Sequence, residues 1–208
     1  MHCIPFGNSS KECFFMDKKK RTARLTLTAL FAALTIVMTV TPYFGYITYG
    51  GVIEITTIHI AVILGAAVLG KKNGALIGGI WGVTCLLRAL TNTALYGLFL
   101  NPLISVVPRI AVGFVAGLLS EKLLKTKLPK ALALSITAAV STLTNTVLVL
   151  GAIYLFGGTM NLYADIFELV KSVFMTIIGI NGIIELLGAV ILVPAIYIPT
   201  QKYFKNKI

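Results

Sequence analysis

Charged residues are scarce in this chain, and their scarcity excludes an ordinary soluble domain. Asp, Glu, Lys and Arg make up 12% of the 208 residues, whereas soluble domains carry roughly a quarter. Hydrophobic residues make up 57% of the chain, and the mean hydropathy is +0.93. So short a chain cannot bury that much apolar surface within itself, so lipid must cover the remainder. The length suits one membrane domain.

Cysteine and histidine are also few, with three and two residues, which argues against metal and redox chemistry. Cys3 and Cys13 lie in the polar start of the chain and Cys85 inside an apolar run, so neither a disulfide framework nor a zinc site is predicted. The segment from Gly65 to Lys72 nearly matches a phosphate-binding loop, but Lys72 replaces the hydroxyl that would hold Mg²⁺. We therefore predict no catalytic residue, no metal and no cofactor.

Acidic residues number only seven against 18 Lys and Arg, which gives a formal net charge of +11. Such an excess can indicate a nucleic-acid partner, but the cations gather beside apolar runs and form no basic face interleaved with aromatic residues. The pattern is typical of a membrane-topology signal, and no nucleic-acid partner is predicted. The clustered cations are Lys11, Lys18, Lys19, Lys20, Arg21, Arg24, Lys71, Lys72, Lys122, Lys125, Lys127, Lys130, Lys202, Lys205 and Lys207.

Six apolar runs predict the fold class, an all-α integral membrane protein built as a compact bundle of six transmembrane helices. Residues 1–16 are predicted to be a disordered polar leader and residues 17–208 a single membrane domain. All clustered cations fall on one side if the loops alternate, which predicts cytoplasmic termini. On the other side, the Gly- and Tyr-rich segment 42–54 is suited to folding over a site. The predicted spans are 23–41, 55–70, 73–91, 102–124, 130–153 and 169–200.

Small residues four apart predict close helix packing in three of these spans. The third span contains Gly74, Gly78 and Gly82, and the fourth contains Gly113 and Gly117. Packing within the chain is the favoured interpretation for both. The first span has a similar pair, Ala29 and Ala33, for which a contact with another subunit is also an option.

Polar residues inside the spans are costly in lipid, so they are the candidate functional residues. Four spans carry them at about the same depth, in the half away from the cationic loops, which predicts a polar pocket that opens outward. The alternative is a purely structural network, in which Arg88 reaches to the surface and Glu185 pairs with Arg109. The sequence favours a structural role for His59. The candidate substrate-binding residues are Trp81, Arg88, Asn101, Ser105, Arg109, Asn145, Asn181 and Glu185, with Ser141, Thr142 and Thr146 beside Asn145.

Several segments, in their order along residues 17 to 205, resemble the substrate-binding (S) component of an energy-coupling factor (ECF) vitamin transporter. The resemblance implies that the chain binds a water-soluble vitamin from outside a prokaryotic plasma membrane. It also implies three partners, a transmembrane coupling subunit contacted by Ala29 and Ala33 and two ATP-binding subunits. The segments are Arg24 to Ala33, Thr56-Thr57-Ile58-His59-Ile60, Gly70-Lys71-Lys72-Asn73-Gly74-Ala75, Asn101-Pro102-Leu103-Ile104-Ser105-Val106-Val107-Pro108-Arg109 and Asn181-Gly182-Ile183-Ile184-Glu185.

The second and fourth of these segments look most like the pantothenate-type branch of the family. Two arginines in the outer half of the spans suit an anionic ligand, because guanidinium forms bidentate contacts with a carboxylate. Asn145 and Asn181 suit its amide and hydroxyl groups. The riboflavin branch tends to carry a lysine shortly after the asparagine of the sixth span, a neighbourhood that Glu185 occupies here. Riboflavin, or another vitamin, is therefore the less favoured alternative.

Two other classes of protein remain as alternatives. An ion-coupled secondary transporter would use Glu185 or His59 to carry a proton, but the inverted repeats typical of that class are not visible in the sequence. A membrane scaffold or an intramembrane enzyme is the third hypothesis, although no chemistry for it is visible.

Overall fold

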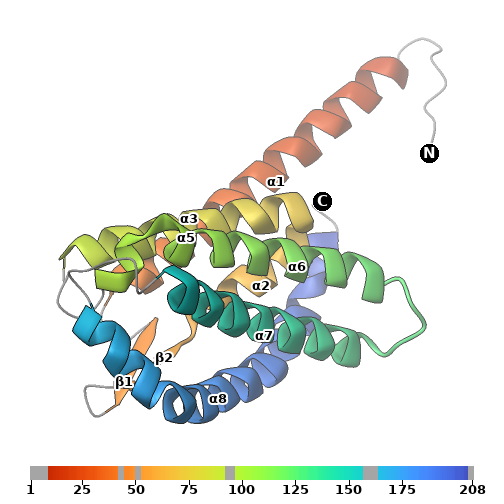
Figure 1. Cartoon of the computed structure of the whole chain (residues 1–208). Helices are drawn as coiled ribbons and strands as arrows, with labels where there is room; N and C mark the ends of the chain where they lie inside the picture. The colour runs from red at the N-terminus through yellow and green to blue at the C-terminus, as the bar shows by residue number, and fades with distance from the viewer. Residues whose placement is uncertain (1–8, 42–44, 50–52, 92–96, 157–163, 206–208) are drawn as a thin grey trace.

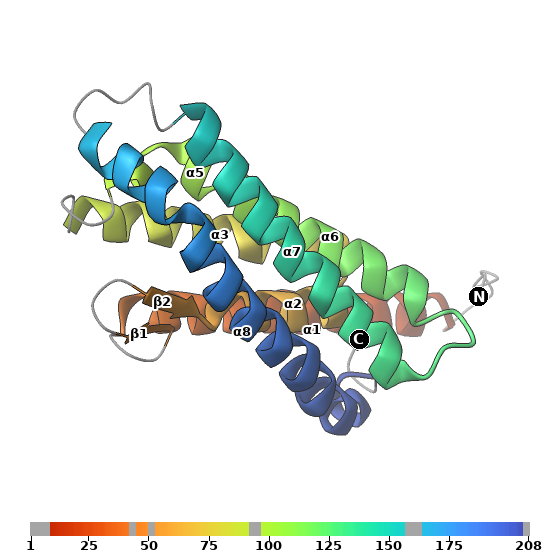
Figure 2. The same cartoon turned by 60° about the horizontal axis from the view of Figure 1, so that its bottom comes forward.

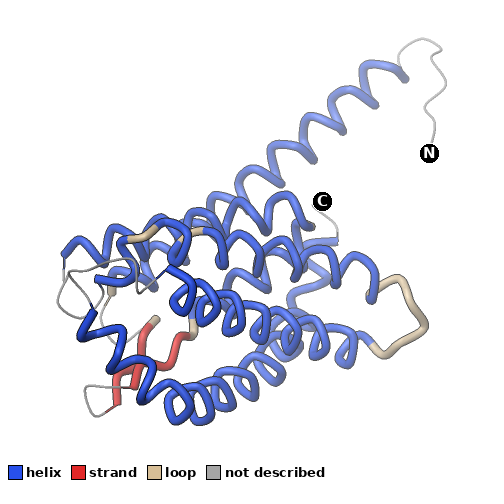
Figure 3. The backbone as a smooth tube through the Cα atoms, in the orientation of Figure 1, coloured by secondary structure: helices blue, strands red, loops and turns tan. Residues whose placement is uncertain are grey.

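The computed structural model describes residues 9–41, 45–49, 53–91, 97–156 and 164–205. Within these ranges, helices form a bundle with a two-stranded hairpin at one end (Figure 1, Figure 3). The helical architecture predicted from the sequence is thereby confirmed. The elements are α1 (Ser9–Val40), β1 (Tyr46–Tyr49), β2 (Ile53–Thr56), α2 (Ile58–Leu69), α3 (Lys71–Thr91), η1 (Gly97–Leu100), α5 (Pro102–Ser105), α6 (Val107–Leu123), α7 (Lys130–Phe156) and α8 (Ala164–Lys205).

Five helical segments of the described chain are long and apolar enough to cross a membrane. The second predicted span differs from them. Its helix, α2, has 12 residues, which amounts to about 18 Å, well short of the roughly 30 Å of bilayer hydrocarbon. The predicted start of this span at residue 55 is wrong, since Ile55 and Thr56 belong to β2. The five segments are Lys20–Val40, Lys71–Thr91, Pro102–Leu123, Lys130–Phe156 and Gly182–Gln201.

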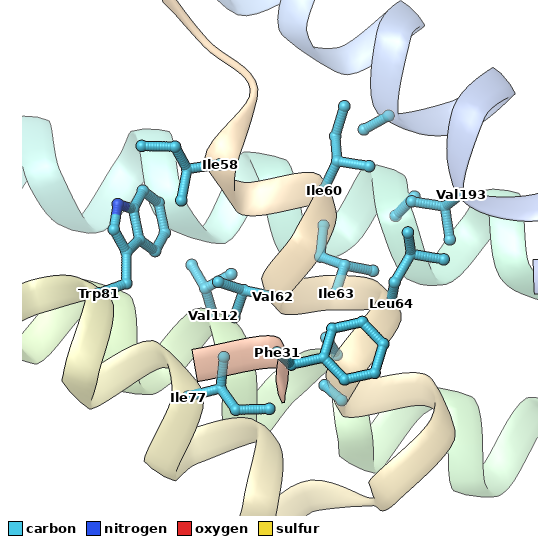
Figure 4. Packing of buried hydrophobic residues seen from close by; sticks show 14 of the residues in the cluster. Phe31, Ile58, Ile60, Val62, Ile63, Leu64, Ile77, Trp81, Val112 and Val193 are labelled. Atoms are coloured by element: carbon cyan, nitrogen blue, oxygen red, sulfur yellow. The ribbon is translucent and has the colours of Figure 1, made fainter. Parts of the chain in front are cut away.

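The short helix α2 lies in the centre of the bundle. It packs against α1, α3 and α6, and almost all of its side chains are buried. A helix that is apolar on every side can be stable only in such surroundings. Its residues Ile58, Val62 and Ile63 form the core cluster with Trp81 of α3 and Val112 of α6 (Figure 4).

The glycines of α3 and α6 face one another, as predicted for packing within the chain. A Cβ added to Gly74 would strike the carbonyl oxygen of Gly113, and one added to Gly78 would strike the carbonyl oxygen of Arg109. At Gly82 it would lie 2.7 Å from the Cα of Val106. The two helices therefore run antiparallel with their backbones in contact, which only residues without a side chain permit. This contact fixes the position of Arg109 relative to α3.

The hairpin between α1 and α2 was not predicted. Its strands pair antiparallel, with Tyr46 opposite Thr56. Its base is closed by a hydrogen bond from the Thr57 N–H to the Gly45 carbonyl at 3.0 Å. The hairpin occupies part of the segment predicted to fold over a site, of which residues 42–44 and 50–52 lie outside the described residues.

One end of the bundle carries exposed lysines. Helix α1 begins and α8 ends at the same end as the connection between α6 and α7 (Figure 1, Figure 2). The lysines of that connection and its flanks, Lys122, Lys125, Lys127 and Lys130, are exposed. The hairpin and η1 lie at the opposite end (Figure 1, Figure 2). Helix α1 runs across residue 16, the predicted boundary between leader and membrane domain, and that division stays a prediction.

Candidate functional site

Arg109 and Trp81 lie together in the middle of the bundle. Their exposed fractions are 7% and 1%, and the guanidinium carbon of Arg109 lies 5.4 Å from the centre of the Trp81 ring. The ring of Phe99, from η1, lies at the same distance from this carbon. Two aromatic rings therefore exclude water from the cation and attract its charge.

Arg109 is held in this place by a carbonyl that a proline leaves free. In a regular helix the Ile104 oxygen would accept the N–H of the residue four positions later. That residue is Pro108, which has no N–H, and the chain is interrupted between α5 and α6 at Val106. The Arg109 Nη1 donates to the Ile104 oxygen at 2.7 Å instead. The Nε–H of Arg109 is buried without a partner.

Asn101 and Ser105, both predicted to bind the substrate, form hydrogen bonds with the local backbone. The Asn101 Oδ1 accepts the Leu103 N–H at 3.0 Å and caps α5. The Ser105 hydroxyl donates to the Phe99 carbonyl. Both side chains therefore fix η1 and α5 around Arg109, and the structure favours a positioning role for them over a direct contact with a ligand.

Helix α7 presents a second group of buried polar atoms. The hydroxyls of Ser141 and Thr142 are unpartnered, and so is the Oδ1 of Asn145. Ser141 and Thr142 are 0% and 1% exposed. Asn145 follows them by four and three positions, so the three share one helix face. Thr146 differs, because its hydroxyl donates to the Thr142 carbonyl at 3.2 Å.

The face of α7 that carries these residues lies at the height of Arg109. Helices α6 and α7 pack side by side and are joined by the short connection 124–129. Arg109 lies fourteen residues before the end of α6, and Asn145 fifteen residues after the start of α7, which places them at about the same level. Leu134 and Ala138, on the same face of α7, belong to one core cluster with Val112. The unpartnered groups of α6 and α7 therefore face one interior region.

Glu185 of α8 holds the base of the hairpin. Its Oε1 accepts the Thr56 N–H at 2.6 Å. The charges of Glu185 and Arg109 act on one another, but no ion pair joins these two described residues and the Arg109 Nε lacks a partner.

His59, in the first turn of α2, is another buried group without a partner. Both of its ring nitrogens lack a hydrogen bond, and the backbone of Thr56 and Glu185 lies close to the ring. The structural role that the sequence favours for His59 stays a prediction.

Arg88 lies near the hairpin. Its guanidinium carbon is 3.8 Å from the centre of the Tyr46 ring, and the Tyr46 hydroxyl lies 3.2 Å from the Cys85 Sγ. Burial against α3 raises the pKa of the Tyr46 hydroxyl well above its ordinary value, so the group keeps its proton. Arg88 therefore fastens β1 to α3 and is less suited than Arg109 to meet a ligand in the interior.

The remaining predicted site residues fall in two places. Asn181 lies on α8, but its side chain is outside the described residues. Ala29 and Ala33 are exposed on α1, beside Leu30 and Val37, which are 63% and 55% exposed. The sequence did not point to Phe99, and it indicated Ser141 and Thr142 only as polar neighbours of Asn145. The spacing of the last two from Asn145 was the signal that could have found them.

The unpartnered atoms define the chemistry that the site can perform. Leaving a buried donor or acceptor without a partner costs about 1–3 kcal/mol, and native structures hold few such groups. Here Trp81 Nε1 and Arg109 Nε are donors, Asn145 Oδ1 is an acceptor, and the hydroxyls of Ser141 and Thr142 can act as either. Among the described residues no group of His, Cys, Asp and Glu could hold a metal ion. The arrangement suits binding of a small polar molecule.

The sequence profile of a family described as ECF transporter, substrate-specific component, matches residues 23–197. The chain belongs to this family. The resemblance predicted from the segment order is confirmed, and placement of the chain in a membrane follows from the family together with the five spanning segments. The family consists of substrate-specific subunits of transporters.

Two relatives of this S component carry names that specify a substrate. One is the pantothenate transporter PanT of Leuconostoc mesenteroides, 36% identical over 112 residues, which cover 51% of this chain and 55% of the relative. This alignment therefore spans about half of the Leuconostoc protein. The other is the pantothenic acid transporter PanT of Lactococcus lactis subsp. cremoris, 28% identical over 194 residues, which cover 86% of this chain and 94% of the relative.

Proposed function

We propose that this S component binds pantothenate at the extracellular side of a prokaryotic plasma membrane and delivers it to an ATP-driven ECF importer. The observation that carries the proposal is that both relatives are named for pantothenate, one of them aligned over 86% of this chain. The unpartnered groups of the interior support it. Pantothenate has a carboxylate, an amide and two hydroxyls, which match the donors and acceptors left by α3, α6 and α7.

The orientation proposed for the chain rests on its charges. The exposed lysines of the α6–α7 connection lie at the end where α1 begins and α8 ends (Figure 2). Cytoplasmic loops carry the excess of Lys and Arg in membrane proteins. We therefore propose that both termini lie in the cytoplasm and that the hairpin and η1 face the exterior.

The partners proposed are a transmembrane coupling subunit and two ATP-binding subunits. The near match to a phosphate-binding loop at Gly65–Lys72 lies in α2 and the start of α3, without the strand that such a loop follows. ATP hydrolysis is therefore assigned to the partners. Ala29 and Ala33 are exposed among apolar side chains of α1, and small residues there let a partner helix approach closely.

Two measurements test the proposal. Mass spectrometry of small molecules that co-purify with the detergent-solubilised chain should find pantothenate; recovery of riboflavin instead would replace it as the substrate. Uptake of labelled pantothenate in cells should require the coupling subunit and both ATPases. Uptake by the chain alone that collapses with the proton gradient would favour an ion-coupled transporter.

A pair of variants tests the surface proposed for the coupling subunit. Ala33→Trp should abolish ATP-dependent uptake and leave pantothenate affinity of the purified chain unchanged, because the residue lies on the outside of α1. Ala195→Trp, at an exposed alanine of α8, is the matched control and should retain uptake. Equal uptake by both variants would remove this surface from the proposal.

A further inference from the structure

We infer that pantothenate binds in one direction, with its carboxylate at Arg109 and Trp81 and its hydroxyl-bearing end at the polar face of α7. This inference rests on the proposed function and assigns the direction of the ligand within the same site. It follows from the kinds of hydrogen-bonding groups that each side of the interior leaves unpaired.

The side formed by α3 and α6 offers donors only. An indole N–H and a guanidinium can donate hydrogen bonds but cannot accept them. The Trp81 Nε1 and the Arg109 Nε are both buried and unpartnered. Only an acceptor can satisfy them, and an anionic one also compensates the charge of Arg109, which no ion pair with Glu185 neutralises. The carboxylate is the group of pantothenate that does both.

The surroundings of Arg109 strengthen its attraction for an anion. The rings of Trp81 and Phe99 lie 5.4 Å from the guanidinium carbon, and the side chain is 7% exposed. Charge-assisted hydrogen bonds are stronger where water is excluded. Because Nη1 is held by the Ile104 oxygen, the guanidinium is fixed in place, and the ligand need not order it on binding.

The side formed by α7 offers what a hydroxyl needs. The Asn145 Oδ1 can only accept a hydrogen bond, whereas the Ser141 and Thr142 hydroxyls donate and accept. A ligand hydroxyl can donate to Asn145 and also pair with either hydroxyl of the protein. Helix α7 contributes no cation at this height, since its lysine, Lys130, begins the helix.

The reverse direction leaves groups in conflict. It would place the carboxylate against the Asn145 Oδ1, where two acceptors repel, and would leave the buried Arg109 cation facing a neutral hydroxyl. The Arg109 cation would then form no direct ion pair, which is unfavourable for a buried charge. The two directions therefore differ in how each half of the ligand responds to substitutions on each side of the site.

The experiment crosses two ligand analogues with two protein variants. Pantothenyl alcohol replaces the carboxylate by a CH₂OH group, and N-(3,3-dimethylbutanoyl)-β-alanine lacks both hydroxyls. Affinities for these and for pantothenate are measured by titration calorimetry on the purified full chain, its Arg109→Gln variant and its Asn145→Ala variant. Thermal melting of each variant, with Gly151→Ala as a reference in an open part of α7, checks that the fold is retained. Should Asn145→Ala melt early, Ser141→Ala replaces it.

In the native chain both analogues should bind at least about 100-fold more weakly than pantothenate, because each leaves buried polar groups unpaired. Arg109→Gln should reduce the preference over pantothenyl alcohol to less than about tenfold and keep the preference over the dideoxy analogue. Asn145→Ala should reduce the preference over the dideoxy analogue and keep the preference over pantothenyl alcohol. The inferred direction would be overturned if Arg109→Gln lost the preference over the dideoxy analogue and Asn145→Ala lost the preference over pantothenyl alcohol. It would also be overturned if both variants kept both preferences while still binding pantothenate. Failure of the native chain to bind pantothenate at all would instead overturn the proposed function.

Discussion

The Arg109 Nη1 donates to the Ile104 carbonyl oxygen at 2.7 Å, five residues back along the chain. This oxygen is available to Arg109 because Pro108, four residues after Ile104, has no backbone N–H to donate to it. One proline thus creates the acceptor that fixes the neighbouring cation, and the fixed cation keeps its Nε–H for the interior. The sequence Pro108-Arg109 therefore fixes a buried guanidinium through a local hydrogen bond.

Pro108→Ala tests whether the free Ile104 carbonyl positions Arg109. The new N–H would bond the Ile104 oxygen and compete with Arg109 for it. We expect pantothenate affinity to fall by about tenfold, the equivalent of 1.4 kcal/mol, while the melting temperature stays the same or rises as α5 and α6 become one regular helix. Calorimetric titration and a melting curve on the same sample provide both values. Unchanged affinity would show that Ile104 does not position Arg109.

The contact between α3 and α6 predicts a contrast between two glycines. In Gly78→Ala the new Cβ would strike the Arg109 carbonyl oxygen, a backbone atom that cannot rotate away. This variant should lose about 2 kcal/mol of stability or more and should also bind pantothenate weakly, because α6 must shift. In Gly151→Ala nothing lies within 4 Å of the new Cβ, so stability should rise by about 0.5–1 kcal/mol. Equal melting temperatures for the two variants would contradict the close contact.

Glu185 is predicted to act through the hairpin. Glu185→Ala removes the acceptor of the Thr56 N–H and should cost about 1.5–3 kcal/mol, seen as faster protease cleavage within the hairpin and weaker ligand binding. Glu185→Gln keeps an oxygen at this position and should retain most of both properties. If Gln abolishes uptake although binding and hairpin protection are intact, Glu185 instead carries a proton in transport.

Substitution by lysine should affect pantothenate binding differently at Arg109 and at Arg88. Lysine keeps the charge but lacks an Nε–H and the planar fork. Arg109→Lys should weaken pantothenate binding at least about tenfold, the equivalent of 1.4 kcal/mol. Arg88→Lys should change it much less, because this guanidinium stacks on Tyr46 at 3.8 Å. Equilibrium dialysis with labelled pantothenate measures both affinities. A larger loss of affinity in Arg88→Lys would indicate that Arg88, and not Arg109, contacts the ligand.

Part of the fold and site could be predicted because the pattern concerned is local. The spacing of Gly74, Gly78 and Gly82 predicted a close helix contact within the chain, and α6 makes that contact. The high cost of a cation in lipid singled out Arg109, which is indeed buried.

The roles of Glu185 and Arg88 depend on tertiary contacts, which the periodicity of the sequence cannot predict. The partner of Glu185 is the backbone N–H of Thr56, 129 positions away. Thr56 itself was assigned to a span because a short apolar strand before a helix has no separate hydrophobic signature. The role of Arg88 was missed for the same reason, since Tyr46 reaches it only through the fold of the hairpin.

The most direct test of pantothenate recognition is an equilibrium titration of pantothenate into the purified chain without any partner subunit. Saturable binding of one pantothenate per chain, with no measurable binding of riboflavin, is the expected result. Saturable binding of riboflavin without binding of pantothenate would contradict it.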